Sequence, residues 1–201
     1  EKVEQSIKEL LLDTANGGFE SGDMISVGNA GIVLASPYIP LLFERLELTS
    51  DERFVSRKAA YKALNLLNYM VYGEHYGDYE GSLLSLILCD LHAGEDRHND
   101  ADAVMRDAGI TTADKALVDS LLDNIIQQWA ALGKTSCDGL RETFLQRQGV
   151  LSYQEEAGWK LSVESSAFDV MLDRIPWGYA TIRYSFMSEL IQVEWRKGGN
   201  S

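Results

Sequence analysis

The hydrophobic pattern of this chain changes its period near residue 149, and this change limits the possible folds more than any other feature. Before it, Leu117 and Leu121 begin an apolar run that recurs every four residues, which is typical of an amphipathic helix. After it, Trp159 and Leu161 alternate with polar residues, which is typical of a half-buried strand. The pattern therefore predicts that the segment 129–177 is a joint where helices give way to a sheet.

The stretch before the joint is interrupted by two prolines. Pro37 and Pro40 divide the apolar run 29–46, and a helix must stop and restart there because proline has no N–H and restricts the residue before it. The run 83–91 is apolar on nearly every side, which predicts a central helix. An apolar stripe between residues 60 and 71 predicts a further buried helix face.

Three segments have the spacing of a capping box, in which a Thr and an acidic residue three positions later satisfy free N–H groups at a helix start. Each predicts that a helix begins there. They are Thr49 to Glu52, Thr111 to Asp114 and Thr135 to Asp138.

Beyond the joint, short alternating segments predict a small sheet. Residues 150–153 and 159–163 flank a Glu-Glu-Ala-Gly turn, which predicts a hairpin. Residues 167–175 read as one short helix, and 182–184 and 191–195 alternate again. The predicted fold class is α+β and mainly α, with an N-terminal helical bundle followed by a small antiparallel β-sheet that carries an inserted short helix.

The length of 201 residues fits one domain with a short appendage. We expect residues 1–22 to form an N-terminal helix and linker, because an apolar face ends at a Gly-Gly pair. Residues 23–201 are then a single α+β domain, helical over 23–148 and β-rich over 149–196. The chain starts with Glu and not Met, and we expect it to be a fragment of a longer protein.

The net charge of -13 bears on the partners that the protein can bind. It argues against nucleic acid and against an anionic membrane, and favours a basic protein partner. The longest apolar run, 31–43, contains prolines and is too short to span a bilayer. Cys89 and Cys137 lie in apolar or helical settings, which predicts free thiols and a cytoplasmic location.

No segment has a catalytic pattern. The His and carboxylate residues between 90 and 102 match no metal motif, so we expect a solvated loop. Cys89 and His92 are three apart, but the apolar setting of Cys89 favours an inert thiol. Asp169 and Asp173 are expected to pair with Arg174 within one helix, and the four tryptophans to anchor the core. We predict no enzyme activity, no catalytic residue, no cofactor and no metal.

Several phrases together resemble a known family. They are NAGIVLASPYIPLLFERL from Asn29, KAAYKALNLLNYMVYG from Lys58, LLSLILCDL from Leu83, KTSCDGLRETFLQRQG from Lys134, GWKLSVE from Gly158, FDVMLDRIPWGYATIR from Phe168 and IQVEW from Ile191. In this order they resemble the C-terminal region of contractile injection system tape measure proteins over about residues 25–195. The chain departs from that pattern at 84–86, 93–107 and 185–187.

The resemblance implies a non-enzymatic structural role in assembling a phage-tail-like particle. It implies tube-length control and docking to baseplate hub or tube components, with a possible homo-oligomer and no membrane insertion. The protein would be cytoplasmic during assembly and part of the injection particle afterwards. An assembly chaperone or cargo adaptor that is absent from the mature particle is the alternative, and a metal-dependent hydrolase using residues 92–102 is a third.

Five residues of the joint are the candidates for a protein-interaction surface. Arg141, Glu142 and Arg147 lie on a short helix and are expected to face outward, where Arg favours interfaces. Trp177 and Gly178 form a turn after the next helix. The choice of these residues rests on the sequence segments that resemble the family and on the expected exposure of their side chains.

Overall fold

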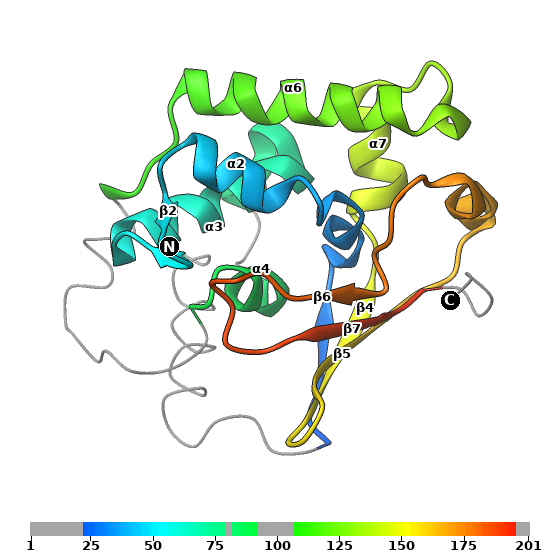
Figure 1. Ribbon diagram of the computed structural model, residues 1–201. Helices are drawn as coiled ribbons and strands as arrows, with labels where there is room; N and C mark the ends of the chain where they lie inside the picture. Colours follow the sequence, from blue (N-terminus) through cyan, green and yellow to red (C-terminus); the bar gives the residue numbers. More distant parts are fainter. Residues whose placement is uncertain (1–21, 79–81, 92–106, 196–201) are drawn as a thin grey trace.

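The computed structural model describes residues 22–78, 82–91 and 107–195, which alternate between short strands and helices (Figure 1). The predicted N-terminal helix and the loop 92–102 lie outside these residues. The strands are β1 (Met24–Val27), β2 (Thr49–Ser50), β3 (Arg53–Phe54), β4 (Gly149–Gln154), β5 (Gly158–Val163), β6 (Thr181–Ile182) and β7 (Ile191–Glu194).

The helices are of three kinds. The α-helices are α2 (Ile39–Arg45), α3 (Arg57–Tyr72), α4 (Leu83–Leu88), α6 (Thr112–Gln128) and α7 (Cys137–Leu140). The 3₁₀ helices are η1 (Ala30–Ala35), η2 (Gly73–Asp78), η3 (Ala130–Leu132) and η5 (Ala167–Arg174), and η4 (Arg141–Leu145) is a π-helix.

The main sheet has five strands in the order β1-β4-β5-β7-β6, and it corrects the predicted fold class. The chain is not a helical bundle followed by an antiparallel sheet. β1 precedes every described helix yet pairs with β4, and β7 runs parallel to β5, so the sheet is mixed. The predicted hairpin is confirmed, since β4 and β5 pair antiparallel from Gly149↔Val163 to Gln154↔Gly158.

The physical reason for the error lies in the lengths of these segments. β1 has four residues, which is too few to show a period, while its backbone groups still satisfy the free edge of β4. Between β5 and β7 the chain passes through η5 and β6 before it returns. This longer connection allows β7 to run parallel to β5, which a tight hairpin does not.

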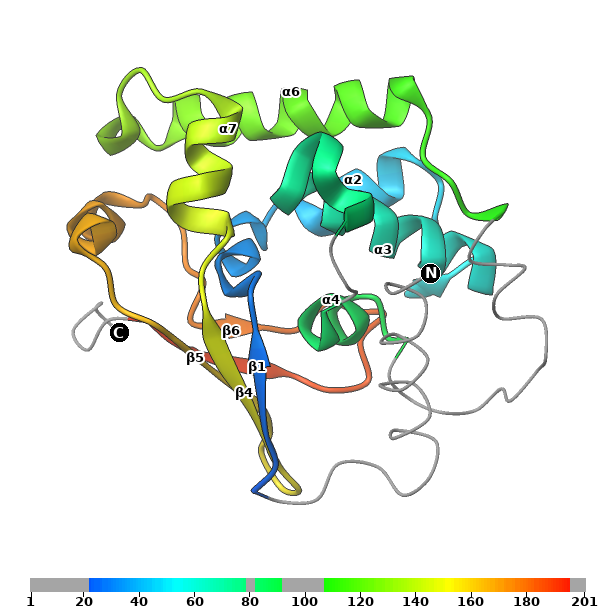
Figure 2. The same ribbon diagram turned by 180° about the vertical axis from the view of Figure 1, so that it is seen from behind.

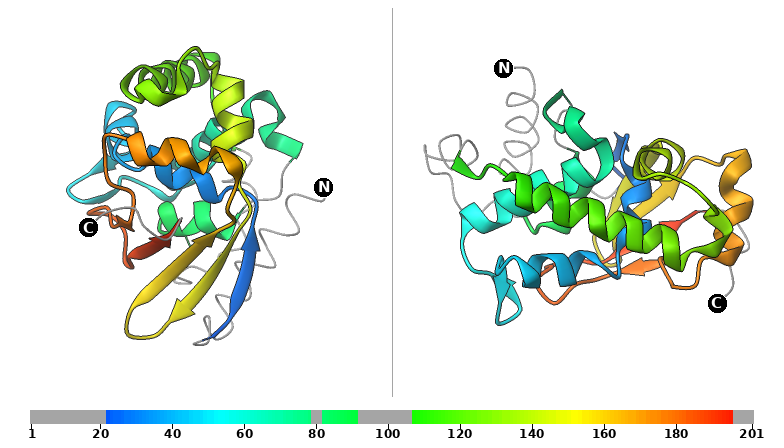
Figure 3. Two further views of the ribbon diagram at one scale, coloured as in Figure 1. Left: turned by 90° about the vertical axis from the view of Figure 1, so that its right-hand side faces the viewer. Right: turned by 90° about the horizontal axis from the view of Figure 1, so that it is seen from above.

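One face of the sheet is buried and the other is polar. Leu151, Leu161 and Trp159 are buried on the inner face. Their neighbours Ser152 and Lys160 pair on the outer face. Figures 2 and 3 show the helices gathered on the inner side, with α6 lying farthest from the sheet.

The prolines divide the apolar run as predicted, and the element before them is fully buried. All six residues of η1 are buried, and α2 restarts with Pro40 in its first turn. η1 packs closely on η4, because a Cβ added at Gly31 would lie 1.6 Å from the Phe144 carbonyl oxygen. The central helix α4 is likewise buried at every position.

Only one of the three predicted capping boxes is confirmed. Thr111 and Asp114 form it at the start of α6, with both reciprocal hydrogen bonds. Thr49 instead opens a small β2–β3 hairpin, and α3 begins later with Ser56 as its cap. The third box does not form, since Ser136 and not Thr135 caps α7, and its side chain accepts from the Gly139 N–H without a reciprocal bond.

Candidate functional site

The joint between helices and sheet is built from α7, η4 and the residues that follow them. α7 has only four residues before the backbone widens into η4, whose Arg141 carbonyl accepts a hydrogen bond from the Gln146 N–H at 2.8 Å. Single π-turns of this kind are rare and occur often at functional sites. The ring of Phe144 packs on Trp129, 4.9 Å between centroids, which fixes the joint to the end of α6.

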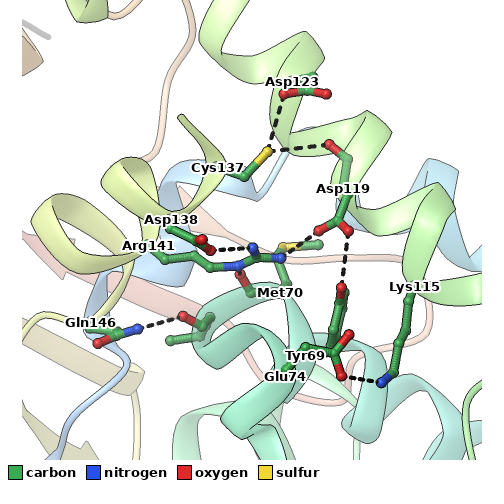
Figure 4. Close-up of polar contacts among 11 residues, drawn as sticks. Tyr69, Met70, Glu74, Lys115, Asp119, Asp123, Cys137, Asp138, Arg141 and Gln146 are labelled. Carbon is green, nitrogen blue, oxygen red and sulfur yellow. Dashed lines mark hydrogen bonds and ion pairs between the residues drawn. The ribbon is translucent and has the colours of Figure 1, made fainter. Parts of the chain in front are cut away.

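Arg141 is buried at the centre of a polar cluster, shown in Figure 4, whose carboxylate partners Asp119 and Asp138 are 40% and 81% exposed. Its guanidinium donates to Asp119 at 2.6 Å and to Asp138 at 2.9 Å, and it lies 5.2 Å from the Tyr69 ring centroid. Burial by itself lowers the pKa of Arg141, but these two carboxylates outweigh it and the pKa is raised. The cluster thus joins α7, η4, α6 and α3 through one permanent cation.

Two groups in and beside this cluster, the Tyr69 phenol and the Cys137 thiol, have raised pKa values and stay protonated. Burial and the hydrogen bond to Asp119 at 3.0 Å raise the pKa of Tyr69 to about 12. Burial and the hydrogen bond to Asp123 at 3.1 Å raise the pKa of Cys137 to about 12. Because a thiolate is the reactive form of cysteine, this thiol is poorly suited to nucleophilic chemistry.

The joint also caps the C-terminus of α3. Arg141 donates through Nε to the Met70 carbonyl at 3.2 Å, and Gln146 donates to the Val71 carbonyl at 2.9 Å (Figure 4). The last carbonyls of a helix have no partner within the helix, and basic or amide side chains satisfy them. Gly73 ends the helix at a φ of 58°.

Arg147 points to the other side of the joint and forms what we call the Arg147 clamp, made of Arg147, Asp169 and Trp195. Its guanidinium donates to Asp169 at 3.0 Å and to the Glu164 carbonyl, and lies 5.4 Å from the Trp195 ring centroid. Asp169 also accepts from the Trp195 indole at 3.2 Å and from the Ser166 N–H at 2.9 Å. Arg147 and Asp169 are both buried, so the clamp is a fully bonded internal ion pair.

Trp177 and Gly178 lie on the turn after η5. The Trp177 indole donates to the Leu34 carbonyl at 2.9 Å, and its ring meets Tyr38 edge-on at 5.3 Å and Trp129 at 6.5 Å. The side chain is half-buried. Gly178 is exposed, and a Cβ added there would have open space around it.

The predicted outward orientation is therefore wrong for both arginines and right for Glu142. Arg141 and Arg147 turn inward, each toward a carboxylate 22 positions away, while Glu142 and Gly178 face solvent. Asp169, expected to pair with Arg174, forms its buried ion pair with Arg147.

Sequence reasoning missed the most exposed apolar side chains near the joint. Phe168 is 53% exposed and Val170 is 60% exposed, and both lie on η5. The signal that would have helped is the Ser166-x-x-Asp169 spacing, which forms a capping box and turns Asp169 inward. With Asp169 and Leu172 on the buried side, Phe168 and Val170 must face out.

The remaining candidates for chemistry divide between described and undescribed residues. His92 and the acidic loop to residue 102 lie outside the described part of the chain. Burial raises the pKa of Cys89 well above its ordinary value, so its thiol stays protonated. In the described part, no three His, Cys, Asp or Glu side chains are grouped in a way that fits a metal ion. Nor does any described helix combine the length and hydrophobicity needed to cross a bilayer.

The geometry thus defines a protein whose polar side chains hold its own elements together. The sequence matches the family model described as contractile injection system tape measure protein over residues 1–195. Because this match spans nearly the whole chain, the protein belongs to that family, and its partners are other components of the particle. No curated protein and no solved structure gives a match to this chain.

Proposed function

We propose that this domain is a non-enzymatic docking module that attaches the tape measure protein to a baseplate or tube component during particle assembly. The family membership supplies the kind of partner. The observation that carries the proposal is the exposure of Phe168 and Val170 beside the joint. Neighbouring exposed apolar side chains that form one patch mark protein interaction sites.

The docking surface, in this proposal, consists of Phe168, Val170, Trp177, Gly178 and Glu142. The first two supply apolar area, and the exposed part of Trp177 extends it along the turn. Glu142 adds a carboxylate at the rim, where charge steers encounter more than it adds affinity. A partner with an apolar groove and a basic rim would match both features.

Arg141 and Arg147 have a different part in this proposal. They are buried, so they position the surface and do not touch the partner. The Arg147 clamp fixes the start of η5 through Asp169, and η5 carries Phe168 and Val170. Arg141 fixes η4, which carries Glu142.

The test replaces the apolar pair and counts particles. The double variant Phe168→Ser with Val170→Ser should fold normally, since both side chains are solvent-exposed, yet yield few particles or particles of irregular length. Leu41 is 60% exposed and Val55 is 55% exposed on another part of the molecule, so Leu41→Ser with Val55→Ser is the matched control. Normal particles from the first variant would remove η5 from the proposal.

Mass spectrometry of purified particles separates docking from a chaperone role. A docking module stays in the finished particle at fixed stoichiometry. Its absence from finished particles, together with a need for it during assembly, would overturn docking in favour of a chaperone or adaptor.

A further inference from the structure

The described chain enters the main sheet at one end and leaves it at the opposite end. β1 is antiparallel to β4, β4 is antiparallel to β5, and β7 is parallel to β5, so β1, β5 and β7 run in one direction. At the entry, the Gly22 N–H donates to the Tyr153 carbonyl at 3.2 Å, close to the β4–β5 turn. At the exit, Glu194 pairs with Ser162 near the far end of β5.

The shared direction of β1, β5 and β7 determines how a force on the two chain ends would load the sheet. A force that draws the two ends apart runs along the strands, while the ladder hydrogen bonds lie across them. All the bonds between β1 and β4, and between β5 and β7, are then stressed together in shear. A force that separates two strands from the same end opens the bonds one after another.

A buried anchor, Asn29, follows the entry strand β1. Asn29 is fully buried, donates to the Ser85 hydroxyl at 2.8 Å and accepts from the Ser82 hydroxyl at 2.6 Å. The Ala30 N–H donates to the Arg147 carbonyl at 2.9 Å. Extraction of β1 would therefore expose a buried amide and break contacts with both α4 and the joint.

A second buried anchor lies at the exit. Trp195 follows β7, donates to Asp169 and stacks on the Arg147 guanidinium. The main chain of Arg147 thus holds the entry anchor, and its side chain holds the exit anchor. One residue links the two ends of the described fold.

We propose that this domain is a mechanical element that transmits tension along the polypeptide, with the shear-stressed sheet and Arg147 as its force path. The proposal uses none of the exposed side chains of the docking surface, and it shares with that surface only the Arg147 clamp that holds η5. It predicts that resistance depends on the direction of the pull and not only on the free energy of unfolding.

Single-molecule force spectroscopy on the full chain tests this directly. One arrangement attaches the handles to the two chain ends, and the other attaches them to the N-terminal end and to position 156. Glu156 is exposed in the β4–β5 turn, so that pull separates β1 from β4 at their shared end. Forced unfolding follows the barrier along the pulling direction, and we expect an end-to-end unfolding force about twofold higher or more. Equal forces, or a weaker end-to-end response, would overturn the proposal.

The variant Trp195→Phe tests the exit anchor. It keeps a ring above Arg147 and removes the hydrogen bond to Asp169. The end-to-end unfolding force should fall, while the force for the pull through position 156 stays the same, because that pull does not stress β7. An equal fall in both directions would show that Trp195 contributes stability alone and would remove it from the force path.

Discussion

Gly31 lies where η1 and η4 approach each other, and the backbone there leaves no room for a side chain. A Cβ would lie 1.6 Å from the Phe144 carbonyl oxygen, which belongs to the main chain and cannot rotate away. Gly31→Ala should destabilise the fold by roughly 3 kcal/mol or more, at the upper end of overpacking effects. Urea unfolding measures this, with Gly178→Ala as the control, since that site is open. Equal urea midpoints for the two variants would contradict the close approach.

The Arg147–Asp169 ion pair is the residue contact that most depends on burial. Both partners are buried, so removing one leaves an uncompensated charge in a poorly solvated site. Arg147→Met should cost about 3–5 kcal/mol of unfolding free energy. Lys160→Met, which breaks the exposed pair with Glu194, should cost at most about 1 kcal/mol. A double-mutant cycle of Arg147→Met and Asp169→Asn should show strong coupling, and simple additivity would contradict the ion pair.

At the scale of the element, the N-terminus of α6 should respond to acid. Burial by itself raises the pKa of Asp114, but hydrogen bonds from Thr111 and from Lys62 outweigh it and hold the pKa below its ordinary value. A carboxylate with a lowered folded pKa adds stability that is complete above its unfolded pKa of about 3.9 and is lost as the pH falls through the folded value. Asp114→Asn should therefore destabilise the protein at about pH 6, and its deficit against the wild type should shrink by about pH 3. Urea midpoints at the two pH values measure this, and a deficit independent of pH would contradict it.

The elements that could be predicted from sequence are those whose signal is local. The β4–β5 hairpin alternates over its full length, and the α6 capping box is satisfied within four residues. β1 could not be predicted, because four residues show no period and its partner is more than a hundred positions away.

The candidate site was predicted in part for the same reason. The joint, its short helix and the turn at Trp177 follow from local patterns. The orientation of the two arginines does not, because Arg141 turns toward Asp119 and Arg147 toward Asp169, each 22 positions distant. The regular helical spacing assumed for them also fails where α7 widens into η4.

At the scale of the whole molecule, the pairing of β1 with β4 joins the N-terminal end of the described chain to the C-terminal sheet. Had the sheet followed the helices, two halves could melt apart at the joint. Instead β1 belongs to the sheet, η1 lies buried between sheet and helices, and Arg147 contacts both sides. The single-domain boundary of residues 23–201 remains a proposal, and these contacts support it.

Because the sheet and the helices share one core, we expect the protein to unfold in one cooperative transition. Helix content followed by far-UV circular dichroism and hydrogen exchange of the β4 and β5 amides should give the same urea midpoint. Leu161→Ala leaves a cavity on the inner face of the sheet, where the side chain is fully buried, and should cost about 2–5 kcal/mol. Because the core is shared, that variant should lower the midpoint of both signals equally, although the substitution lies only in the sheet. A sheet that exchanges its amides while the helices remain intact would mean that the joint separates two folding units and does not unite them.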